Sequence, residues 1–253
     1  MQPSPHSCFR KHLILSLATV FSASGMVWGF TPESRLTITL NAFKLMPPSL
    51  RIQLEKHKKE CLRGALDPLN IEGEEAHHPG ENGKLLAERI SAQVDKIVGM
   101  IGRHETFKKV IYEMGVLSHY TADLNFPVSI NGEGKEHYLN FARFCYRKEK
   151  KIRIVFYGFE DSFLARKDIP SFSSEAIRRS SSNIPFLKEA FLRAANGSET
   201  EFDDRSTLFG VAALSYSHAV TDIAKIWLYA WNEAKGDLTE TPHLRTLQAR
   251  GKM

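Results

Sequence analysis

The chain has 253 residues, of which 42% are hydrophobic and 25% are charged, and its formal net charge is +5. This composition excludes an intrinsically disordered chain and fits one globular domain of ordinary size, or at most two. The positive excess is small, and its densest runs are 56–59 and 147–153. Such runs more often cover solvated helix faces than bind nucleic acid, although they also suit anionic lipid or phosphate-bearing substrates.

The first 27 residues have the pattern of a secretory signal peptide. Basic residues at 10–12 precede an apolar run at 13–21, and small residues at 23–25 offer a cleavage site. The apolar run is too short for a secure membrane span, and an uncleaved N-terminal anchor is the alternative. We therefore expect an exported bacterial protein, periplasmic or secreted.

The sequence predicts three segments: a signal peptide at 1–27, one domain at 28–236 and a flexible polar tail at 237–253. Thr31 is a candidate N-cap, with Pro32 at the first helical position and Glu33 in the first turn. A second helix is expected from Ser49 to Gly64, where glycine typically ends a helix.

A polar stretch rich in Gly and Pro follows at 65–83. Its length and composition predict a functional loop. It carries Asp67 and two adjacent histidines, His77 and His78, all of which are potential metal ligands.

Apolar residues at helical spacing predict further helices, at 85–101, 105–124, 137 to about 157, 184–195, and 203 or 204 to 235. The β-branched residues at 152–157 leave the end of the helix that starts at 137 undetermined. The stretch 158–182 has no clear periodicity. We find neither strand alternation nor a repeat of fixed period. The expected fold class is all-α, a bundle of about six or seven helices with functional sites between them.

The cysteines leave two interpretations open. Cys8 lies in the leader, whereas Cys61 and Cys145 belong to the mature chain. A disulfide between them requires an oxidising compartment, and two buried thiols are at least as consistent with the sequence.

Two predicted helices each carry a histidine and an aspartate four residues apart: His119 with Asp123, and His218 with Asp222. This spacing places both side chains on one helix face, and zinc accepts nitrogen and oxygen donors. A single helical histidine is usually structural, but two such pairs and the histidine loop together favour a metal site. No nucleophile motif such as G-x-S-x-G is present.

The segment 119–127, His-Tyr-Thr-Ala-Asp-Leu-Asn-Phe-Pro, resembles the signature of bacterial zinc-dependent phospholipases C. These enzymes share their fold with fungal single-strand-specific zinc nucleases. Trp28-Gly29 resembles the start of mature family members, whose N-terminal tryptophan is a ligand. Asp67-Pro68 falls where the family has a loop aspartate, His78 or His77 follows it, and His137 begins the next helix as another ligand does.

The resemblance implies an all-α fold with up to three zinc ions in a cleft that hydrolyses phosphodiester bonds. It implies one intact site, composed of Asp67, His78, His119 and Asp123, and places His137 in a second.

The sequence departs from the family pattern at three other ligand positions. Ser129 stands where the motif ends in histidine, and Glu33 or Ser34 stands where a histidine follows the N-terminal tryptophan. Phe141 replaces an acidic residue one turn after His137. Glu33 can still bind a metal through oxygen, and His218 and Asp222 are candidate replacements.

The leading hypothesis is an exported zinc-dependent hydrolase of phosphoester bonds, with one or two ions and with Asp67 and Asp123 in catalytic roles. Its substrate would be a phosphoester such as a phospholipid head group, with transient contact to a membrane surface and no specific nucleic acid. One alternative is a non-catalytic binding or scaffold protein stabilised by metal. A nuclease on the same scaffold is the other.

Overall fold

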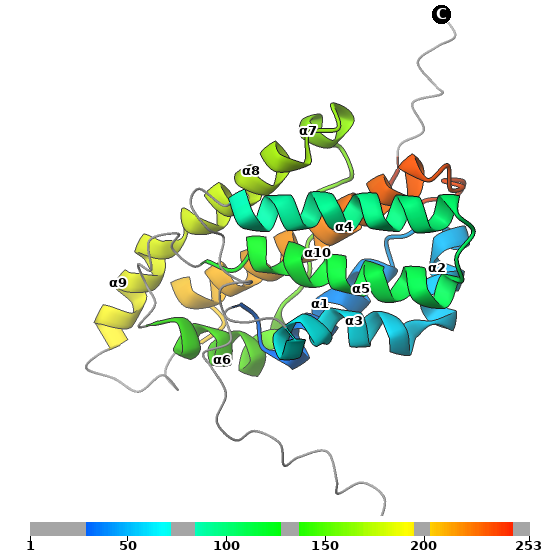
Figure 1. The fold of residues 1–253 in the computed structure, drawn as a ribbon. Helices are drawn as coiled ribbons and strands as arrows, with labels where there is room; N and C mark the ends of the chain where they lie inside the picture. The colour runs from blue at the N-terminus through cyan, green and yellow to red at the C-terminus, as the bar shows by residue number, and fades with distance from the viewer. Residues whose placement is uncertain (1–28, 72–83, 128–136, 195–202, 245–253) are drawn as a thin grey trace, which may run out of the picture.

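The computed structural model describes residues 29–71, 84–127, 137–194 and 203–244 (Figure 1). The described residues contain helices and no strand, which confirms the all-α class. The helices are α1 (Pro32–Phe43), α2 (Pro48–Lys56), α3 (Lys58–Ile71), α4 (Lys84–Gly102), α5 (Phe107–Leu124), α6 (Tyr138–Lys148), the 3₁₀ helix η4 (Glu149–Lys151), α7 (Ser162–Ala165), α8 (Ile169–Ser181), α9 (Ile184–Ala194) and α10 (Thr207–Glu233).

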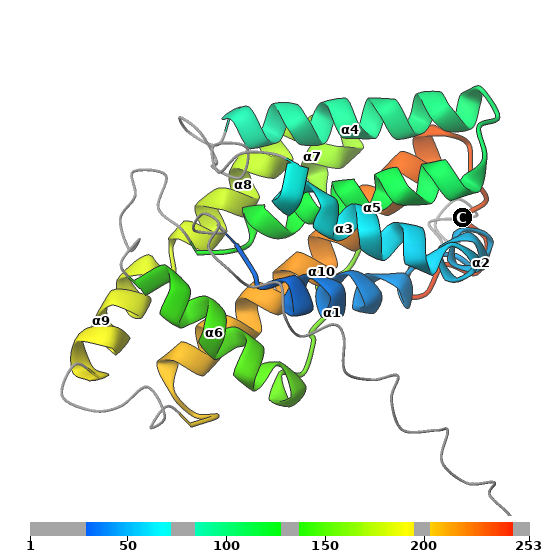
Figure 2. The ribbon, with the colours of Figure 1, turned by 60° about the horizontal axis from the view of Figure 1, so that its bottom comes forward.

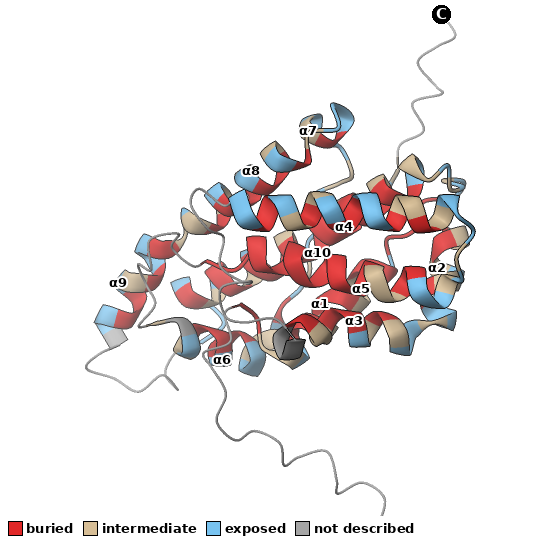
Figure 3. Ribbon diagram, viewed as in Figure 1, coloured by how far each residue is buried: buried red, intermediate tan, exposed pale blue. Residues whose placement is uncertain are grey.

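Helices α5 and α10 form the centre of the bundle. The stretch 114–124 of α5 is buried at every position, and α10 is buried over most of its length (Figure 3). A helix that is covered on all sides is a core element. Helix α4 lies along one side of α5, while α1, α3 and α6 form the near face in Figure 2.

Helices α3 and α5 approach each other closely because two glycines lie at their contact. A Cβ added at Gly115 would be 2.0 Å from the carbonyl oxygen of Cys61, and one added at Gly64 would be 2.1 Å from that of Tyr112. No side chain fits in that space, so the two backbones pack directly on each other. This contact brings the carbonyl of Ala65 to the side of α5.

Three polar contacts hold α1 and α10 against the rest of the core. The indole Nε1 of Trp227 donates to the carbonyl of Met114 at 2.9 Å, and Thr39 and Ser118 share a buried hydrogen bond of 3.1 Å. The hydroxyl of Tyr216 donates to Ser34 at 2.6 Å. Because these groups are buried, each bond also satisfies a polar atom that would otherwise be costly to bury.

Several expected elements are confirmed. Thr31 caps α1, its side chain accepting from the backbone nitrogen of Ser34 at 3.3 Å. The helices expected at 85–101, 105–124 and 184–195, and the long C-terminal helix, occur with no end displaced by more than four residues.

The expected helix from Ser49 to Gly64 is wrong in both boundaries. It begins at Pro48, is interrupted at His57, and resumes as α3, which continues to residue 71. Gly64 does not end the helix because it serves the contact with α5. Asp67 is therefore a helix residue, although we expected it in a loop.

Two further expectations, both in the C-terminal half, differ from the structure. The helix expected to reach about residue 157 ends at 148, and after η4 an extended segment follows, as β-branched residues favour. The mixed stretch 158–182 contains α7 and α8. Asp168 caps α8 by accepting from Ser171 at 3.0 Å, and the serine content of α8 conceals a buried apolar face at Ile169, Phe172 and Ile177. The bundle thus has more helices than the six or seven expected.

Cys61 and Cys145 are both free and buried. Burial raises the pKa of each thiol. Asp237, at the start of the expected tail, accepts hydrogen bonds through its carbonyl from Ser49 at 2.7 Å and Trp231 at 3.0 Å. None of the described helices combines the length and apolar character needed to cross a bilayer.

Candidate metal centre

His119 and Asp123 lie one turn apart near the end of α5 and face each other. The Nε2 atom of His119 is 3.4 Å from Oδ2 of Asp123, and both side chains are almost fully buried. Bonds of about 2.0–2.2 Å from zinc to nitrogen and oxygen, at a tetrahedral angle, separate two ligand atoms by about 3.4 Å. The pair therefore has the spacing of two neighbouring corners of a zinc site.

The ring of His119 is held by a carbonyl from α3. Its Nδ1 lies 2.8 Å from the carbonyl oxygen of Ala65. Because a carbonyl only accepts, Nδ1 carries the hydrogen, and in the neutral ring the lone pair of Nε2 points towards Asp123. Metal-binding histidines are oriented by such a bond from the other ring nitrogen. A shared proton or a metal ion between these two atoms would interact favourably with both.

The other oxygen of Asp123 is paired with Arg35 of α1. The Nη2 atom of Arg35 lies 2.5 Å from Oδ1, and the Arg35 side chain is only 1% exposed. Its Nε donates to the carbonyl of Phe30 at 3.0 Å and its Nη1 to the carbonyl of His119 at 3.3 Å. Three donor groups of one guanidinium are thus engaged with three separate acceptors.

Gly29 covers this ion pair. A Cβ at this position would lie 2.2 Å from Nη2 of Arg35 and 2.3 Å from Oδ1 of Asp123, and the φ of Gly29 is +108°. Only glycine fits there without strain.

Phe30, whose carbonyl accepts from Arg35, belongs to a cluster of aromatic side chains. Phe30 makes edge contacts with Tyr216 and Phe126, each with ring centroids 5.1 Å apart, and Phe126 contacts Phe141 at 5.5 Å. Phe141 is 1% exposed. Phe141, at the position where the resemblance implies an acidic ligand, is therefore a core residue here.

The remaining candidates of the N-terminal half occupy different surroundings. Asp67 accepts from the hydroxyl of Tyr112 at 3.0 Å and is partly exposed. Glu33 is exposed. Burial is the main cause that raises the pKa of Glu149, and the negative charge of Glu33 raises it further. His137 precedes α6, and its ring stacks on Phe191 with centroids 4.8 Å apart. Trp28, His77, His78 and Ser129 lie outside the described residues.

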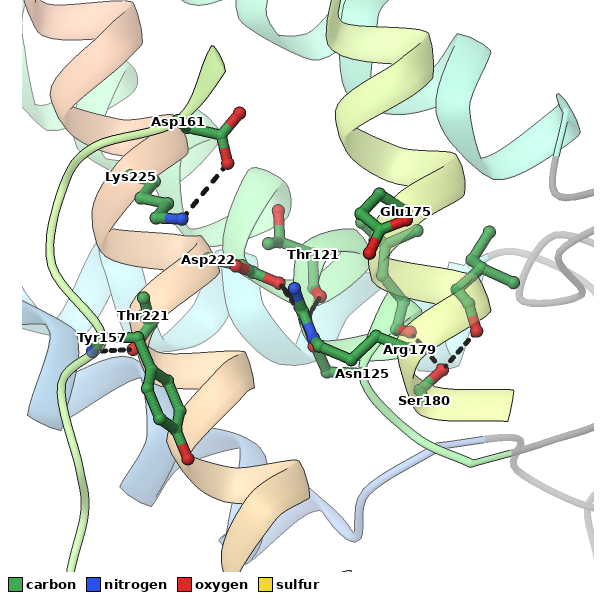
Figure 4. Close-up of polar contacts among 12 residues, drawn as sticks. Thr121, Asn125, Tyr157, Asp161, Glu175, Arg179, Ser180, Thr221, Asp222 and Lys225 are labelled. Atoms are coloured by element: carbon green, nitrogen blue, oxygen red, sulfur yellow. Dashed lines mark hydrogen bonds and ion pairs between the residues drawn. The ribbon is translucent and has the colours of Figure 1, made fainter. Parts of the chain in front are cut away.

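The second His/Asp pair, on α10, is arranged differently. Asp222 is buried and accepts from Nδ2 of Asn125 at 3.0 Å and from Nη2 of Arg179 (Figure 4). Arg179 also donates to Oδ1 of Asn125 at 3.0 Å, which closes a triangle between the end of α5, α8 and α10. His218 instead stacks on Tyr157, with centroids 4.4 Å apart.

Burial dominates the electrostatics of this second pair. It raises the pKa of Asp222, and Arg179 and Asn125 act in the opposite direction. Burial, with smaller effects of Arg179 and Lys225, lowers the pKa of His218 to about 4. Asp222, Asn125 and Arg179 thus form a polar clamp that joins the end of α5, α8 and α10. None of the contacts of His218 and Asp222 supports the prediction that these two residues complete the metal site.

Within the described ranges, no three His, Cys, Asp or Glu side chains are grouped to hold a metal ion. His119 and Asp123 fit two neighbouring zinc ligands. On its Oδ1 side, Asp123 already has a cation in Arg35.

No protein-family model and no curated protein matches this sequence. Among solved structures, the chain is similar to the crystal structure of alpha-toxin from an avian strain, SWCP, of Clostridium perfringens, with a TM-score of 0.54 and 14% identity. The match covers 83% of this chain and 67% of the toxin chain. The chain shares the alpha-toxin fold. Alpha-toxin is a zinc phospholipase C, so the predicted resemblance is confirmed as a structural match to a divergent sequence.

Sequence reasoning missed Arg35 and Arg179, the two cations that determine the surroundings of the aspartates. Arg35 lies in the first turn of α1, where a positive charge opposes the helix dipole. That local conflict signals a partner elsewhere in the fold. Arg179 lies in the last turn of α8. The helix dipole favours a cation there, so the position of Arg179 in the sequence does not indicate a distant partner.

Proposed function

We propose that this protein is an exported, zinc-dependent hydrolase of phosphoester bonds, of the phospholipase C type. The observation that carries the proposal is the 3.4 Å separation of His119 Nε2 and Asp123 Oδ2, in a buried pair. The fold supports it, because the alpha-toxin structure with the same fold belongs to a zinc phospholipase C.

In this proposal, His119 and Asp123 each provide one ligand to a zinc ion. His77 and His78 are the candidates for the remaining ligands, from their positions in the sequence. Asp67 is not grouped with His119 and Asp123 in the structure. A zinc ion with an open position would polarise a phosphoryl oxygen and lower the pKa of bound water to about 7.

The residues that surround the pair have supporting roles. The carbonyl of Ala65 fixes the tautomer and orientation of His119. Arg35 holds the carboxylate of Asp123 in one orientation. The substrate class that follows is a phosphoester, such as a phospholipid head group at a membrane surface.

A second candidate function is a non-catalytic, metal-stabilised scaffold. The specific observation in its favour concerns Phe141. This residue stands where the resemblance implies an acidic ligand, and its side chain is packed in the core. A scaffold requires the metal for stability and performs no chemistry with it.

The two candidates are separated by measuring zinc content and turnover of a p-nitrophenyl phosphodiester by the purified full-length chain. The enzyme hypothesis predicts bound zinc and turnover that a chelator abolishes and added zinc restores. Asp123→Asn should lose turnover. Asp222→Asn is the matched control, because it also changes a buried aspartate paired with an arginine, and it should retain turnover if folded.

Bound zinc without turnover of the phosphodiester or of phosphatidylcholine vesicles would favour the scaffold. Absence of both zinc and turnover would contradict the proposed function itself.

A further inference from the structure

The two oxygens of Asp123 have different partners. Oδ1 pairs with the guanidinium of Arg35 at 2.5 Å, whereas Oδ2 faces the imidazole of His119 at 3.4 Å. A carboxylate can bind a separate cation through each of its oxygens. Here one of those two cations is part of the chain.

The arrangement around Arg35 fixes its charge in place. Its side chain is 1% exposed, and its three donor groups reach acceptors on the N-terminal segment and on α5. The last turn of α5 has the negative end of the helix dipole, so a cation is favoured there. The backbone of Gly29 closes over the pair so tightly that no Cβ fits.

We propose that Arg35 is a positioning residue that takes the place of a metal ion at Oδ1 of Asp123. It thereby limits this carboxylate to one metal ion, bound through Oδ2 together with His119. The metal at Oδ2 rests on the proposed function, but the exclusion of a metal from Oδ1 does not. A divalent ion at Oδ1 would meet the positive charge of Arg35 at contact distance in a buried site, where repulsion is poorly screened.

The inference also bears on Glu33 and Trp28, which the sequence offers as ligands close to Arg35. Glu33 is exposed and acts on Glu149, whereas Arg35, two residues later, reaches Asp123. The cation at Oδ1 of Asp123 is therefore supplied by the chain itself.

The test compares wild type with Arg35→Met, Arg35→Lys and Arg179→Met. Methionine keeps an unbranched apolar stem and removes the charge, whereas lysine keeps the charge. Arg179→Met is the matched control, since it removes the arginine from the other buried aspartate, whose histidine stacks on Tyr157. Each protein is equilibrated with buffered free zinc, zinc per chain is measured by elemental analysis, and the unfolding midpoint is recorded with zinc and with chelator.

We expect Arg35→Met to bind about one zinc ion more per chain than wild type. Oδ1 of Asp123 and the carbonyl oxygens of Phe30 and His119 lose the cation that they share, and a metal ion can take its place. Zinc should raise its unfolding midpoint more than that of wild type. Arg35→Lys and Arg179→Met should show no gain in zinc.

Equal zinc contents in wild type and Arg35→Met, with equal stabilisation by zinc, would overturn the inference and leave the proposed function intact. Zinc absent from wild type but gained by Arg35→Met would support the inference and contradict the proposed function. If Arg35→Met is unfolded in chelator, recovery of its helical circular dichroism on adding zinc supports the inference. Failure to recover, with Arg35→Lys folded, overturns it.

Discussion

The chain contains the same motif twice, a histidine and an aspartate at i, i+4, and the two copies differ in structure. Each aspartate is buried and paired with an arginine, Arg35 for Asp123 and Arg179 for Asp222. On α5 the histidine is turned towards its aspartate by the carbonyl of Ala65. On α10 the histidine stacks on Tyr157, and Asn125 takes its place beside the aspartate.

The comparison shows what helical spacing determines and what it leaves to the neighbouring elements. Spacing places both side chains on one face in each copy. The orientation of the imidazole depends on the element packed against that face: a close-packed helix beside α5, and an extended segment beside α10. The first arrangement is a candidate ligand pair, and the second is a clamp between helices.

The largest expected effect concerns stability and distinguishes the two arginines. Arg35→Met should lower the free energy of unfolding in chelator by about 3–5 kcal/mol, since it leaves a buried carboxylate without its cation. Arg179→Met should cost only about 1–2 kcal/mol, because Asn125 still donates to Asp222. Denaturant unfolding followed by circular dichroism measures both. Equal losses would show that the two pairs are equivalent.

The next effect tests the contact that positions Ala65 beside His119. Gly115→Ala should destabilise the protein by about 3 kcal/mol, because its Cβ would overlap the backbone of α3. Gly210→Ala is the control in α10, where the added Cβ meets nothing within 4 Å. It should be neutral or stabilise by up to about 1 kcal/mol. A mild effect of Gly115→Ala would mean that α3 can move away from α5 at little cost.

A smaller effect is expected at the residue that covers the first ion pair. Gly29→Ala should cost about 2–3 kcal/mol, from its positive φ and from overlap with Arg35 and Asp123. Gly158 has a φ of +89° and open space around it. Gly158→Ala should therefore lower the free energy of unfolding only by the cost of a positive φ, about 1–2 kcal/mol. The difference between the two variants reports the overlap, and no difference would refute the close approach.

The last effect is a pH dependence that belongs to the second pair and is absent near neutral pH. The folded protein lowers the pKa of His218 to about 4 from an ordinary value of 6.5. The unfolded chain therefore binds a proton first, and stability should fall as pH decreases from 6.5 towards 4. His218→Phe keeps a ring for stacking on Tyr157 and should lose this part of the pH dependence. The measurement is thermal unfolding of wild type and His218→Phe across that pH range. Identical pH profiles of the two proteins would contradict the prediction.

The sequence predicts the fold class and most of the helices because apolar periodicity records which helix faces are buried. It fails at Gly64, which ordinary helix rules read as an end although it is a packing contact with Tyr112. It also fails over α8, where serines occupy positions that pack as core. In both cases, the deciding interaction is with a residue distant in sequence.

The candidate site was predictable to a similar degree. His119 and Asp123 follow from spacing, and their mutual approach is found in the structure. Arg35 is separated from Asp123 by 88 positions, and nothing in a local pattern links them. The difference between the pairs of α5 and α10 was not predictable for the same reason, since Ala65 and Tyr157 set it from other segments.

The central claim is that the pair on α5 binds zinc and the pair on α10 does not. Its most direct test is calorimetric titration of zinc into chelator-treated wild type, His119→Gln and His218→Gln. We predict that His218→Gln binds zinc as wild type does and that His119→Gln binds it at least about tenfold more weakly. Equal affinity in His119→Gln and wild type, or a loss confined to His218→Gln, would contradict the claim.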